Sequence, residues 1–360
     1  MSGIGRRWRA AAVTVGVLGT LGTSAAWGQV IDLGRGPVTV HVPPTYDPAT
    51  PAPLVMLLHG YSASGAVQEG YMQFTPLADE FGFLYLFPDG TVDCLGNRFW
   101  NATDACCNFC GSTVDDSGYL LALIDEVKMR FNVDPGRVYL VGHSNGGFMA
   151  YRTACDHADT IAAIASLAGA TFLNPAACSP AAPVHVLQIH GTADTVIAYG
   201  GGCLPVSGCF PGAVATVEQW ASFDGCAPTA DPSAPPLDLD AGLTGNETVV
   251  TRYASGCAPG GSAELWTIVG GAHTPNLSAN FSRLVVEFLL AHPKPPPGLA
   301  GDANCDGVAD LLDIQPFVLA LTDPTAYAAA FPTCSQADAN GDGQLNGADV
   351  AVFVSVLTGP

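Results

Sequence analysis

Short, mostly apolar runs alternate with amphipathic segments over most of the chain. The apolar runs show no regular alternation of apolar and polar positions, and they lie at 54–58, 83–87, 138–141, 161–164, 184–189 and 265–269. Runs of this kind are typical of strands that are buried on both faces of a parallel sheet. Between them lie segments with apolar residues at helical spacing, most clearly from Asp116 to Phe131. This order of elements predicts a doubly wound α/β domain with a mostly parallel sheet, about 260 residues long.

One early segment has a different pattern. Residues 38–42 (Val-Thr-Val-His-Val) alternate between apolar and polar positions. Alternation indicates a strand with one face buried and one face in solvent. We therefore expect an antiparallel edge strand that leads into the parallel sheet.

The first 28 residues have the layout of a secretory signal peptide. Arg6, Arg7 and Arg9 precede an apolar run over 10–25, and small residues offer a cleavage site before Gln29. A run of roughly 16 residues is short for a membrane-spanning helix, which needs about 20. No later stretch is long and apolar enough to span a bilayer. The sequence predicts a secreted, extracellular protein without a membrane span, whose large domain covers residues 29–292.

Proline ends the pattern of the large domain. Residues 293–298 read Pro-Lys-Pro-Pro-Pro-Gly, and proline at this density favours an extended, semi-rigid spacer. We therefore predict a linker over residues 293–300. The remaining residues, 301–360, contain eight Asp and no Lys, Arg or Glu. This change in composition indicates a second, small domain.

Charge and cysteine content narrow the class of protein. The chain has 12 Lys+Arg against 32 Asp+Glu and a formal net charge of −20, which argues against nucleic acid as a partner because phosphate contacts need clustered basic side chains. Twelve cysteines in an exported protein indicate disulfides. Local spacing favours the pairs Cys155–Cys178 and Cys226–Cys257. The pairing of the other cysteines of the large domain stays open: Cys94, Cys106, Cys107, Cys110, Cys203 and Cys209.

The most informative stretch is Gly142-His-Ser-Asn-Gly146, which follows a predicted buried strand and precedes a predicted helix. A Gly-x-Ser-x-Gly sequence in this setting is typical of a nucleophile elbow. The turn is too tight for side chains at the flanking positions, so glycine occupies them and the serine is presented on the bend. The pattern predicts Ser144 as a catalytic nucleophile.

A serine hydroxyl needs a base to remove its proton and an acid to orient that base. In proteins with this elbow the two partners follow at the ends of later strands, the acid before the histidine. The run 184–189 leads to Asp194, and the run 265–269 leads to His273. We therefore predict Asp194 as the acid and His273 as the base.

Two alternatives to these partners stay open. His190 also ends a predicted strand, but it precedes the acid and is followed by Gly, as in a structural turn. Asp224 could replace Asp194, but it follows a predicted helix and not a strand. His143 adjoins the nucleophile and is expected to pack beside the sheet, because an elbow points neighbouring side chains away from each other.

Two backbone N–H groups are expected to bind the negative charge that develops on a substrate carbonyl oxygen. One is the N–H of Asn145, which directly follows the nucleophile. The other belongs to the loop after the strand at 54–58, which continues as His59-Gly60-Tyr61. We predict the N–H of Tyr61 as this second donor.

Seven short motifs now appear in a characteristic order. They are Leu-His-Gly (58–60), Phe-Pro-Asp-Gly (87–90), Phe-Trp-Asn (99–101), Val-Asp-Asp (114–116), Gly-His-Ser-Asn-Gly-Gly (142–147), His-Gly-Thr-Ala-Asp (190–194) and Gly-Gly-Ala-His (270–273). Over residues 38–290 the chain resembles the secreted esterases grouped as polyhydroxybutyrate depolymerase-like, feruloyl esterase-like and acetylxylan esterase-like. The resemblance implies an α/β-hydrolase fold, acyl-enzyme chemistry on an ester and no metal in catalysis. Many of these esterases have Met where this chain has His143, and a Trp where it has Pro275.

The acidic C-terminal segment contains two similar loops, at 302–313 and 338–349. Oxygen-bearing side chains at loop positions 1, 3, 5, 9 and 12, with Gly at 6, match a calcium-binding loop, in which position 7 contributes its backbone carbonyl. The sequence predicts two structural calcium ions. The predicted ligands are Asp302, Asn304, Asp306, Val308, Asp310 and Asp313 in the first loop, and Asp338, Asn340, Asp342, Gln344, Asn346 and Asp349 in the second.

Each loop ends in Asp and precedes an apolar helix, expected at 314–321 and 350–357. In these features residues 301–359 resemble a type I dockerin module. The resemblance implies a small all-α calcium-binding domain that docks to a cohesin or a cell-surface receptor. Cys305 and Cys334 are the two cysteines of this segment and are expected to form a bridge.

Together these features predict a secreted serine carboxylesterase. The dockerin-like segment favours feruloyl or acetyl esters of a plant polysaccharide as substrates, whereas the large domain is equally compatible with a polyhydroxyalkanoate such as polyhydroxybutyrate. A different class, a carbohydrate- or surface-binding module on an inactive hydrolase scaffold, stays open as well. Labelling by a fluorophosphonate probe distinguishes the enzyme from this last alternative.

Overall fold

The computed structural model describes residues 29–205, 207–295, 300–306, 308–332, 334, 336–340 and 344–358. The predicted signal peptide, residues 1–28, and residues 296–299 of the predicted linker lie outside this part of the chain. Within it, no helix has the length and the apolar composition needed to cross a membrane.

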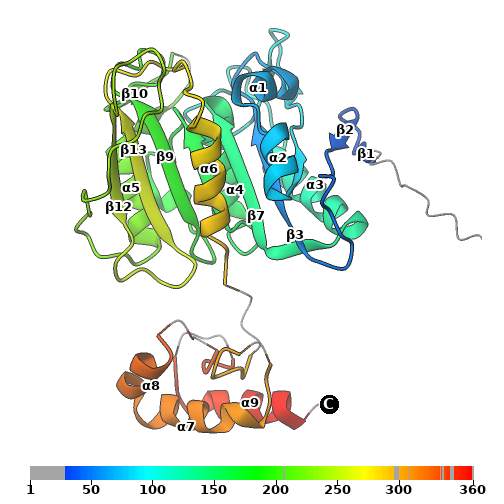
Figure 1. Cartoon of the computed structure of the whole chain (residues 1–360), viewed down its shortest axis with the longest axis vertical. Coiled ribbons are helices and arrows are strands. Elements are labelled where there is room, and N and C mark those ends of the chain that lie inside the picture. The colour runs from blue at the N-terminus through cyan, green and yellow to red at the C-terminus, as the bar shows by residue number, and fades with distance from the viewer. Residues whose placement is uncertain are drawn as a thin grey trace, which may run out of the picture.

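A seven-stranded sheet forms the centre of the large domain (Figure 1). Its spatial order is β12-β13-β9-β8-β7-β3-β4. Neighbouring strands are parallel except β12, which pairs antiparallel with β13 at one edge. The strands are β3 (Ala52–Leu58), β4 (Leu84–Leu86), β7 (Val133–His143), β8 (Ala163–Leu167), β9 (His185–Gly191), β12 (Thr248–Tyr253) and β13 (Ser262–Ile268). This arrangement confirms the predicted mostly parallel sheet of an α/β-hydrolase-like fold.

Helices cover both faces of the sheet (Figure 1). The helices of one core are α3 (Asp116–Arg130), α4 (Asn145–Asp156) and α5 (Ala213–Phe223), and those of the other are α1 (Gly65–Met72), α2 (Thr75–Phe81) and α6 (Phe281–Ala291). In β3, Leu54, Met56 and Leu58 belong to the first core, whereas Val55 and Leu57 belong to the second. Because side chains alternate across a strand, a strand that is buried on both faces is apolar at every position.

Three small hairpins lie outside this sheet: β1 (Gln29–Ile31) with β2 (Val38–Val40), β5 (Thr91–Val92) with β6 (Arg98–Phe99), and β10 (Gly201–Cys203) with β11 (Cys209–Pro211). The expectation that residues 38–42 form an edge strand of the main sheet is therefore wrong. The segment pairs locally with β1, and a single antiparallel bridge joins His41 to Tyr85 of β4. The antiparallel edge of the main sheet is instead β12.

Six disulfides pair all twelve cysteines, every one of which lies in the described residues. They are Cys94–Cys110, Cys106–Cys107, Cys155–Cys178, Cys203–Cys209, Cys226–Cys257 and Cys305–Cys334. Three of them join the pairs that the sequence favoured. The Cys94–Cys110 bridge closes a loop that contains β6 and begins two residues after the end of β5.

The C-terminal segment has helices and a small core of its own. Its elements are the 3-10 turn η2 (Leu311–Asp313) and the helices α7 (Ile314–Thr322), α8 (Pro324–Ala330) and α9 (Ala348–Thr358). Phe317 of α7 and Phe353 of α9 stack with their ring centroids 3.8 Å apart. Tyr327 of α8 is buried in the same cluster.

Candidate active site

The predicted elbow lies between the end of β7 and the start of α4. Ser144 has φ 54° and ψ −120°, a strained conformation for a residue with a side chain. Glycine is required on both sides of it: a Cβ on Gly142 would lie 2.1 Å from the carbonyl oxygen of Gly146, and a Cβ on Gly146 would lie 2.2 Å from that of Leu58. The turn therefore presents the Ser144 side chain on a bend that the surrounding backbone enforces.

The structure brings Ser144, His273 and Asp194 together. The Nε2 atom of His273 lies 3.0 Å from the Ser144 Oγ, and its Nδ1 atom lies 2.8 Å from the Asp194 Oδ2. Asp194 follows β9 and His273 follows β13, so both come from the carboxyl edge of the sheet, next to the elbow at the end of β7. The geometry is that of a serine whose proton can pass to an imidazole oriented by a carboxylate.

The Asp194 carboxylate is buried, with 6 % of the residue exposed. Its Oδ1 accepts the backbone N–H groups of Val196 and Ile197 at 2.8 and 2.9 Å. Burial opposes ionisation, but hydrogen bonds with His190 and His273 outweigh it and hold the pKa of Asp194 well below its ordinary value. Asp194 is therefore charged at neutral pH.

His190 does not contact Ser144 in this arrangement. Its Nε2 lies 2.8 Å from the carbonyl oxygen of Ile197 and 3.3 Å from the Asp194 Oδ2, so this nitrogen carries the proton and donates. Its Nδ1 accepts from the amide of Gln188 at 3.1 Å. Both ring nitrogens are thus occupied, and His190 supports Asp194 instead of replacing His273.

Asp224 lies near the amino-terminal end of β9, opposite the end of the strand that leads to Asp194. Its Oδ1 accepts the N–H of Val184, the residue before β9, at 3.1 Å. Asp194, by contrast, follows the other end of the same strand. The geometry therefore disfavours Asp224 as the partner of His273.

The two predicted oxyanion donors flank the elbow. A Cβ built on Gly60 would lie 3.4 Å from the Ser144 Cβ, so the backbone that leads into Tyr61 passes directly beside the nucleophile. Asn145 begins α4 immediately after it. The Tyr61 hydroxyl donates to Asp93 at 2.7 Å and accepts from Asn97 at 2.9 Å, which fixes this loop against the β5–β6 hairpin.

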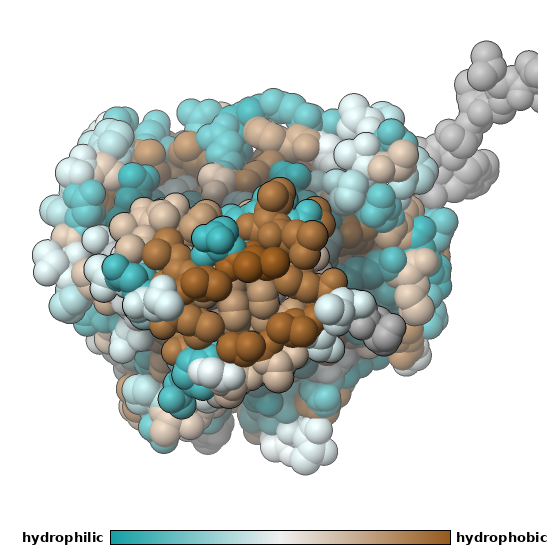
Figure 2. Space-filling view, turned by 90° about the horizontal axis from the view of Figure 1, so that it is seen from below, coloured by the Kyte–Doolittle hydropathy of each residue, from teal (hydrophilic) through white to brown (hydrophobic). Residues whose placement is uncertain are grey.

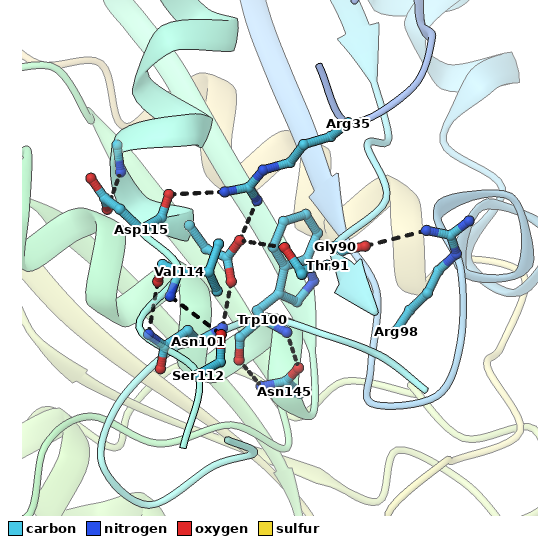
Figure 3. A network of polar contacts seen from close by, with 12 residues as sticks. Arg35, Gly90, Thr91, Arg98, Trp100, Asn101, Ser112, Val114, Asp115 and Asn145 are labelled. Carbon is cyan, nitrogen blue, oxygen red and sulfur yellow. Dashed lines mark hydrogen bonds and ion pairs between the residues drawn. The ribbon is translucent and has the colours of Figure 1, made fainter. Parts of the chain in front are cut away.

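A polar network behind these donors was not foreseen as part of the site (Figure 3). The Asn145 side chain bonds both backbone groups of Trp100, at 2.7 and 3.0 Å, and the Trp100 indole donates to the carbonyl of His59 at 3.0 Å. The residue after Trp100 is Asn101, and its backbone N–H donates to the buried Asp116 carboxylate at 2.6 Å. Asp116 also forms an ion pair with Arg35. The network thus ties the loop before Tyr61 to the elbow. The motifs Leu-His-Gly, Phe-Trp-Asn, Val-Asp-Asp and Gly-His-Ser-Asn-Gly-Gly contain all of these residues except Arg35, so the sequence already pointed to them.

His143 is not placed as the sequence interpretation expected. Its Nε2 lies 3.0 Å from the carbonyl oxygen of His273, and the two rings are 5.2 Å apart. Burial lowers the pKa of His143 to about 4, with a smaller opposing contribution from that hydrogen bond. The sequence predicted that His143 packs beside the sheet; in the structure a neutral His143 contacts the loop that carries the predicted base.

The predicted calcium ligands lie in two loops with similar hydrogen bonds. The buried Asp313 accepts the N–H groups of Asn304 and Asp310 at 2.9 and 2.7 Å, and the buried Asp349 accepts those of Asn340 and Asn346 at 3.2 and 2.9 Å. The other predicted ligands within the described residues are Asp302, Asp306, Val308, Asp338 and Gln344, whereas Asp342 lies outside them. Among described residues no three His, Cys, Asp or Glu side chains are grouped as for a metal ion.

The chain is similar in sequence to known esterases and polyester depolymerases. Residues 38–220 match the family model described as esterase PHB depolymerase. The chain is 30 % identical over 243 residues to feruloyl esterase B of Piromyces equi (66 % of this chain, 42 % of that protein) and 31 % identical over 137 residues to a poly(3-hydroxybutyrate) depolymerase of Ralstonia pickettii (35 % and 28 %). It spans less than half the length of either relative. An acetyl xylan esterase structure from Aspergillus awamori gives a TM-score of 0.49 at 15 % identity, covering 72 % of this chain and 98 % of that one. By the match to its model, the chain belongs to the esterase PHB depolymerase family.

Proposed function

We propose that the protein is a serine carboxylesterase that works through an acyl-enzyme. The observation that carries this proposal is the series of hydrogen bonds from Ser144 through His273 to Asp194, at 3.0 and 2.8 Å, on a strained elbow. Membership of an esterase family supports the same reaction.

Each step follows from the geometry. The Ser144 Oγ attacks the ester carbonyl carbon while the His273 Nε2 takes the hydroxyl proton. The resulting imidazolium is stabilised by the Asp194 carboxylate on Nδ1, and the N–H groups of Tyr61 and Asn145 bind the oxyanion. The intermediate then expels the alcohol, which takes its proton from His273. Water, deprotonated by the same imidazole, hydrolyses the acyl-serine and restores the enzyme.

The Ser144→Ala variant tests this proposal. With p-nitrophenyl acetate as substrate, we expect turnover to fall by several orders of magnitude, since loss of a nucleophile costs roughly 10⁶ in rate. We expect the variant to keep the fold, with a melting temperature near that of the parent. Activity retained in a folded variant would remove Ser144 from its role.

We propose esters on plant polysaccharides, feruloyl or acetyl, as the substrate class. The similarity to feruloyl esterase B and the dockerin-like C-terminal segment support it. Polyhydroxyalkanoate is the second candidate, and the similarity to a poly(3-hydroxybutyrate) depolymerase favours it. Rates on methyl ferulate, acetylated xylan and amorphous polyhydroxybutyrate, each with Ser144→Ala as the blank, separate the candidates. Hydrolysis of polyhydroxybutyrate alone would refute the first.

For the C-terminal segment we propose a dockerin-like domain that binds two calcium ions. In both loops the buried carboxylate at position 12 accepts the N–H groups of positions 3 and 9. The proposed ligand oxygens come from carboxylates, Asn amides and the backbone carbonyls of Val308 and Gln344, which suits a hard cation such as calcium. When bound, calcium would neutralise the acidic loops and stabilise this domain, with no part in ester hydrolysis.

Calcium binding is testable by melting. We expect calcium to raise the melting temperature of the C-terminal segment and the chelator EGTA to lower it. The Asp302→Ala and Asp338→Ala double variant should lose this response, while the esterase activity stays unchanged. A response to calcium that survives in this variant would contradict the ligand assignment.

We further propose that this domain docks to a cohesin or a cell-surface receptor. Figure 2 shows hydrophobic residues gathered on the face seen from below, where Figure 1 shows α7 and α9. Exposed apolar side chains of η2, α7 and α9 include Leu311, Leu312, Ile314, Val318, Val350, Val354 and Val356. A patch of this kind marks an interaction surface. Surface plasmon resonance on immobilised cohesins, with a Leu311→Asp and Val354→Asp variant as control, tests the idea, and equal responses of both proteins would contradict it.

We also propose that the protein is exported. All twelve cysteines are paired in the structure, as expected for an oxidising compartment, and residues 1–28 have the pattern of a signal peptide. N-terminal sequencing of protein recovered from the medium should begin near Gln29. Retention of the full chain inside the cell would contradict export.

A further inference from the structure

The loop that carries His273 is held at two backbone carbonyl groups by side chains from elsewhere in the fold. The Nε2–H of His143, at the end of β7, donates to the carbonyl oxygen of His273 at 3.0 Å. The hydroxyl of Tyr71, near the end of α1, donates to the carbonyl oxygen of Pro275, two residues further on, at 2.7 Å. The rings of Tyr71 and His143 adjoin, with centroids 5.7 Å apart.

The preceding half of this loop is fixed separately. The N–H of Gly270 donates to the Thr192 hydroxyl at 2.7 Å, and the N–H of Ala193 donates to the carbonyl of Gly271 at 2.9 Å. These bonds tie the loop to the loop of Asp194 but end before His273. The contacts of His143 and Tyr71 hold the carbonyl groups of His273 and Pro275. The next residue, Asn276, is held by a backbone bond, because its carbonyl accepts the N–H of Ala241 at 2.7 Å.

The helix that carries Tyr71 is itself rigidly mounted. At its start, the N–H of Gly65 donates to Asp89 at 2.8 Å, and a Cβ on Gly65 would lie 2.0 Å from the carbonyl oxygen of Phe87. At its end, the Ser282 hydroxyl of α6 donates to the carbonyl of Met72. Tyr71 therefore holds the loop from a fixed position.

We propose that Tyr71 and His143 are positioning residues that hold the His273 imidazole in line with Ser144. The inference rests on the proposed function of this triad. Each donor bonds a backbone carbonyl, so neither exchanges protons with the reacting atoms. A hydroxyl and an imidazole N–H are suited to this task because each donates to a single backbone acceptor.

The chemistry of both donors agrees with this role. Burial raises the pKa of the Tyr71 hydroxyl, so it stays protonated and donates. Burial lowers the pKa of His143 to about 4, so it stays neutral when His273 becomes an imidazolium only 5.2 Å away. A second positive charge at that distance would oppose proton transfer from Ser144. His143 can therefore hold the base without competing with it.

Four single variants, and the double variant that combines Tyr71→Phe with His143→Met, test the inference. Tyr71→Phe removes one donor and keeps the ring, and His143→Met removes the other. His143→Gln retains an N–H donor at the reach of Nε2, so it should restore most of what His143→Met loses. Tyr46→Phe is the matched control, because the Tyr46 hydroxyl also contacts one backbone group, the N–H of Asn132 at 2.8 Å, away from the site.

We expect about a tenfold fall in kcat for Tyr71→Phe and for His143→Met and about 100-fold for the double variant, since a misplacement of about 1 Å costs roughly that much. KM should change less than twofold, because neither side chain binds substrate. The downfield proton resonance of the His273 Nδ1–H should broaden in the double variant and stay sharp in Tyr46→Phe.

The outcomes separate this inference from the proposed function. If Ser144→Ala abolishes hydrolysis but the double variant keeps kcat within twofold of the parent, the positioning role is refuted and the triad stands. A lower kcat that His143→Gln does not restore, with an unchanged Nδ1–H resonance, would equally refute it. If Ser144→Ala is active, the proposed function fails first.

Discussion

Asp224 offers a test of how burial acts on charge in this fold. The residue is 1 % exposed, its Oδ1 has the N–H of Val184 as partner, and no described group bonds its Oδ2. Burial raises its pKa from 3.8 to about 7, although the Val184 N–H and the nearby Lys294 act in the opposite direction. Lys294 itself is anchored here, because its N–H donates to the carbonyl of Gly136 at 2.8 Å and its Nζ to that of Pro183 at 2.7 Å.

The raised pKa makes stability depend on pH with a definite sign. Between the pKa of the unfolded state and that of the folded state, unfolding releases a proton. The contribution of Asp224 to stability is therefore fully present below about pH 4 and is lost as pH rises through 7. For a shift from 3.8 to about 7, the loss between pH 5 and pH 8 is about 2.6 kcal/mol. The Asp224→Asn variant keeps an acceptor for Val184 and cannot ionise, so it should escape this loss.

Urea unfolding at pH 5 and pH 8 measures the effect. Tryptophan fluorescence reports on the large domain alone, since residues 300–360 contain no Trp. From pH 5 to pH 8, the free energy of unfolding of Asp224→Asn should rise by about 2–3 kcal/mol relative to that of the parent. The control variant Asp125→Asn, at an exposed position of α3, should show the same pH dependence as the parent. Esterase kcat should be unchanged in both variants, because both lie away from Ser144. An equal pH slope in parent and Asp224→Asn would refute the reasoning.

Further predictions concern the fold and the elbow. Replacing both Cys155 and Cys178 by Ser should lower the free energy of unfolding by about 3 kcal/mol, because the bridge closes a loop with a sequence separation of 23; denaturant titration checks it, and an unchanged midpoint would contradict it. Asn145→Ala leaves two buried backbone groups of Trp100 without partners, so kcat should fall at least tenfold with a lower melting temperature, and a fully active variant would exclude a role for the network. Gly142→Ala places a Cβ 2.1 Å from a backbone oxygen and should abolish both activity and labelling of the serine, whereas normal labelling would show that the elbow can adapt.

The parts of the site that the sequence predicted share one property. Ser144, Asp194 and His273 each follow a buried strand, and parallel strands end at the same edge of a sheet. The order of strands along the sequence was therefore enough to predict that the three residues lie close together, without any knowledge of side-chain contacts.

The parts that were missed depend on contacts distant in sequence. His143 bonds a carbonyl 130 residues away and Asn145 bonds a backbone 45 residues away. Which way such side chains turn is decided by the packing of several loops. The pairing Cys106–Cys107 was equally open, because six cysteines allow 15 pairings. The edge strand β12 was missed because its sequence does not follow its burial: Thr248 is buried, whereas Val249 is exposed.

The most direct test of the central claim is covalent labelling by a fluorophosphonate probe. We expect one adduct per folded chain in the intact mass, mapped to the peptide that contains Ser144. Labelling should disappear in Ser144→Ala and slow markedly in His273→Ala. A folded protein that takes up no probe would contradict the account and favour an inactive hydrolase scaffold, and an adduct on any other serine would refute the assignment of the nucleophile.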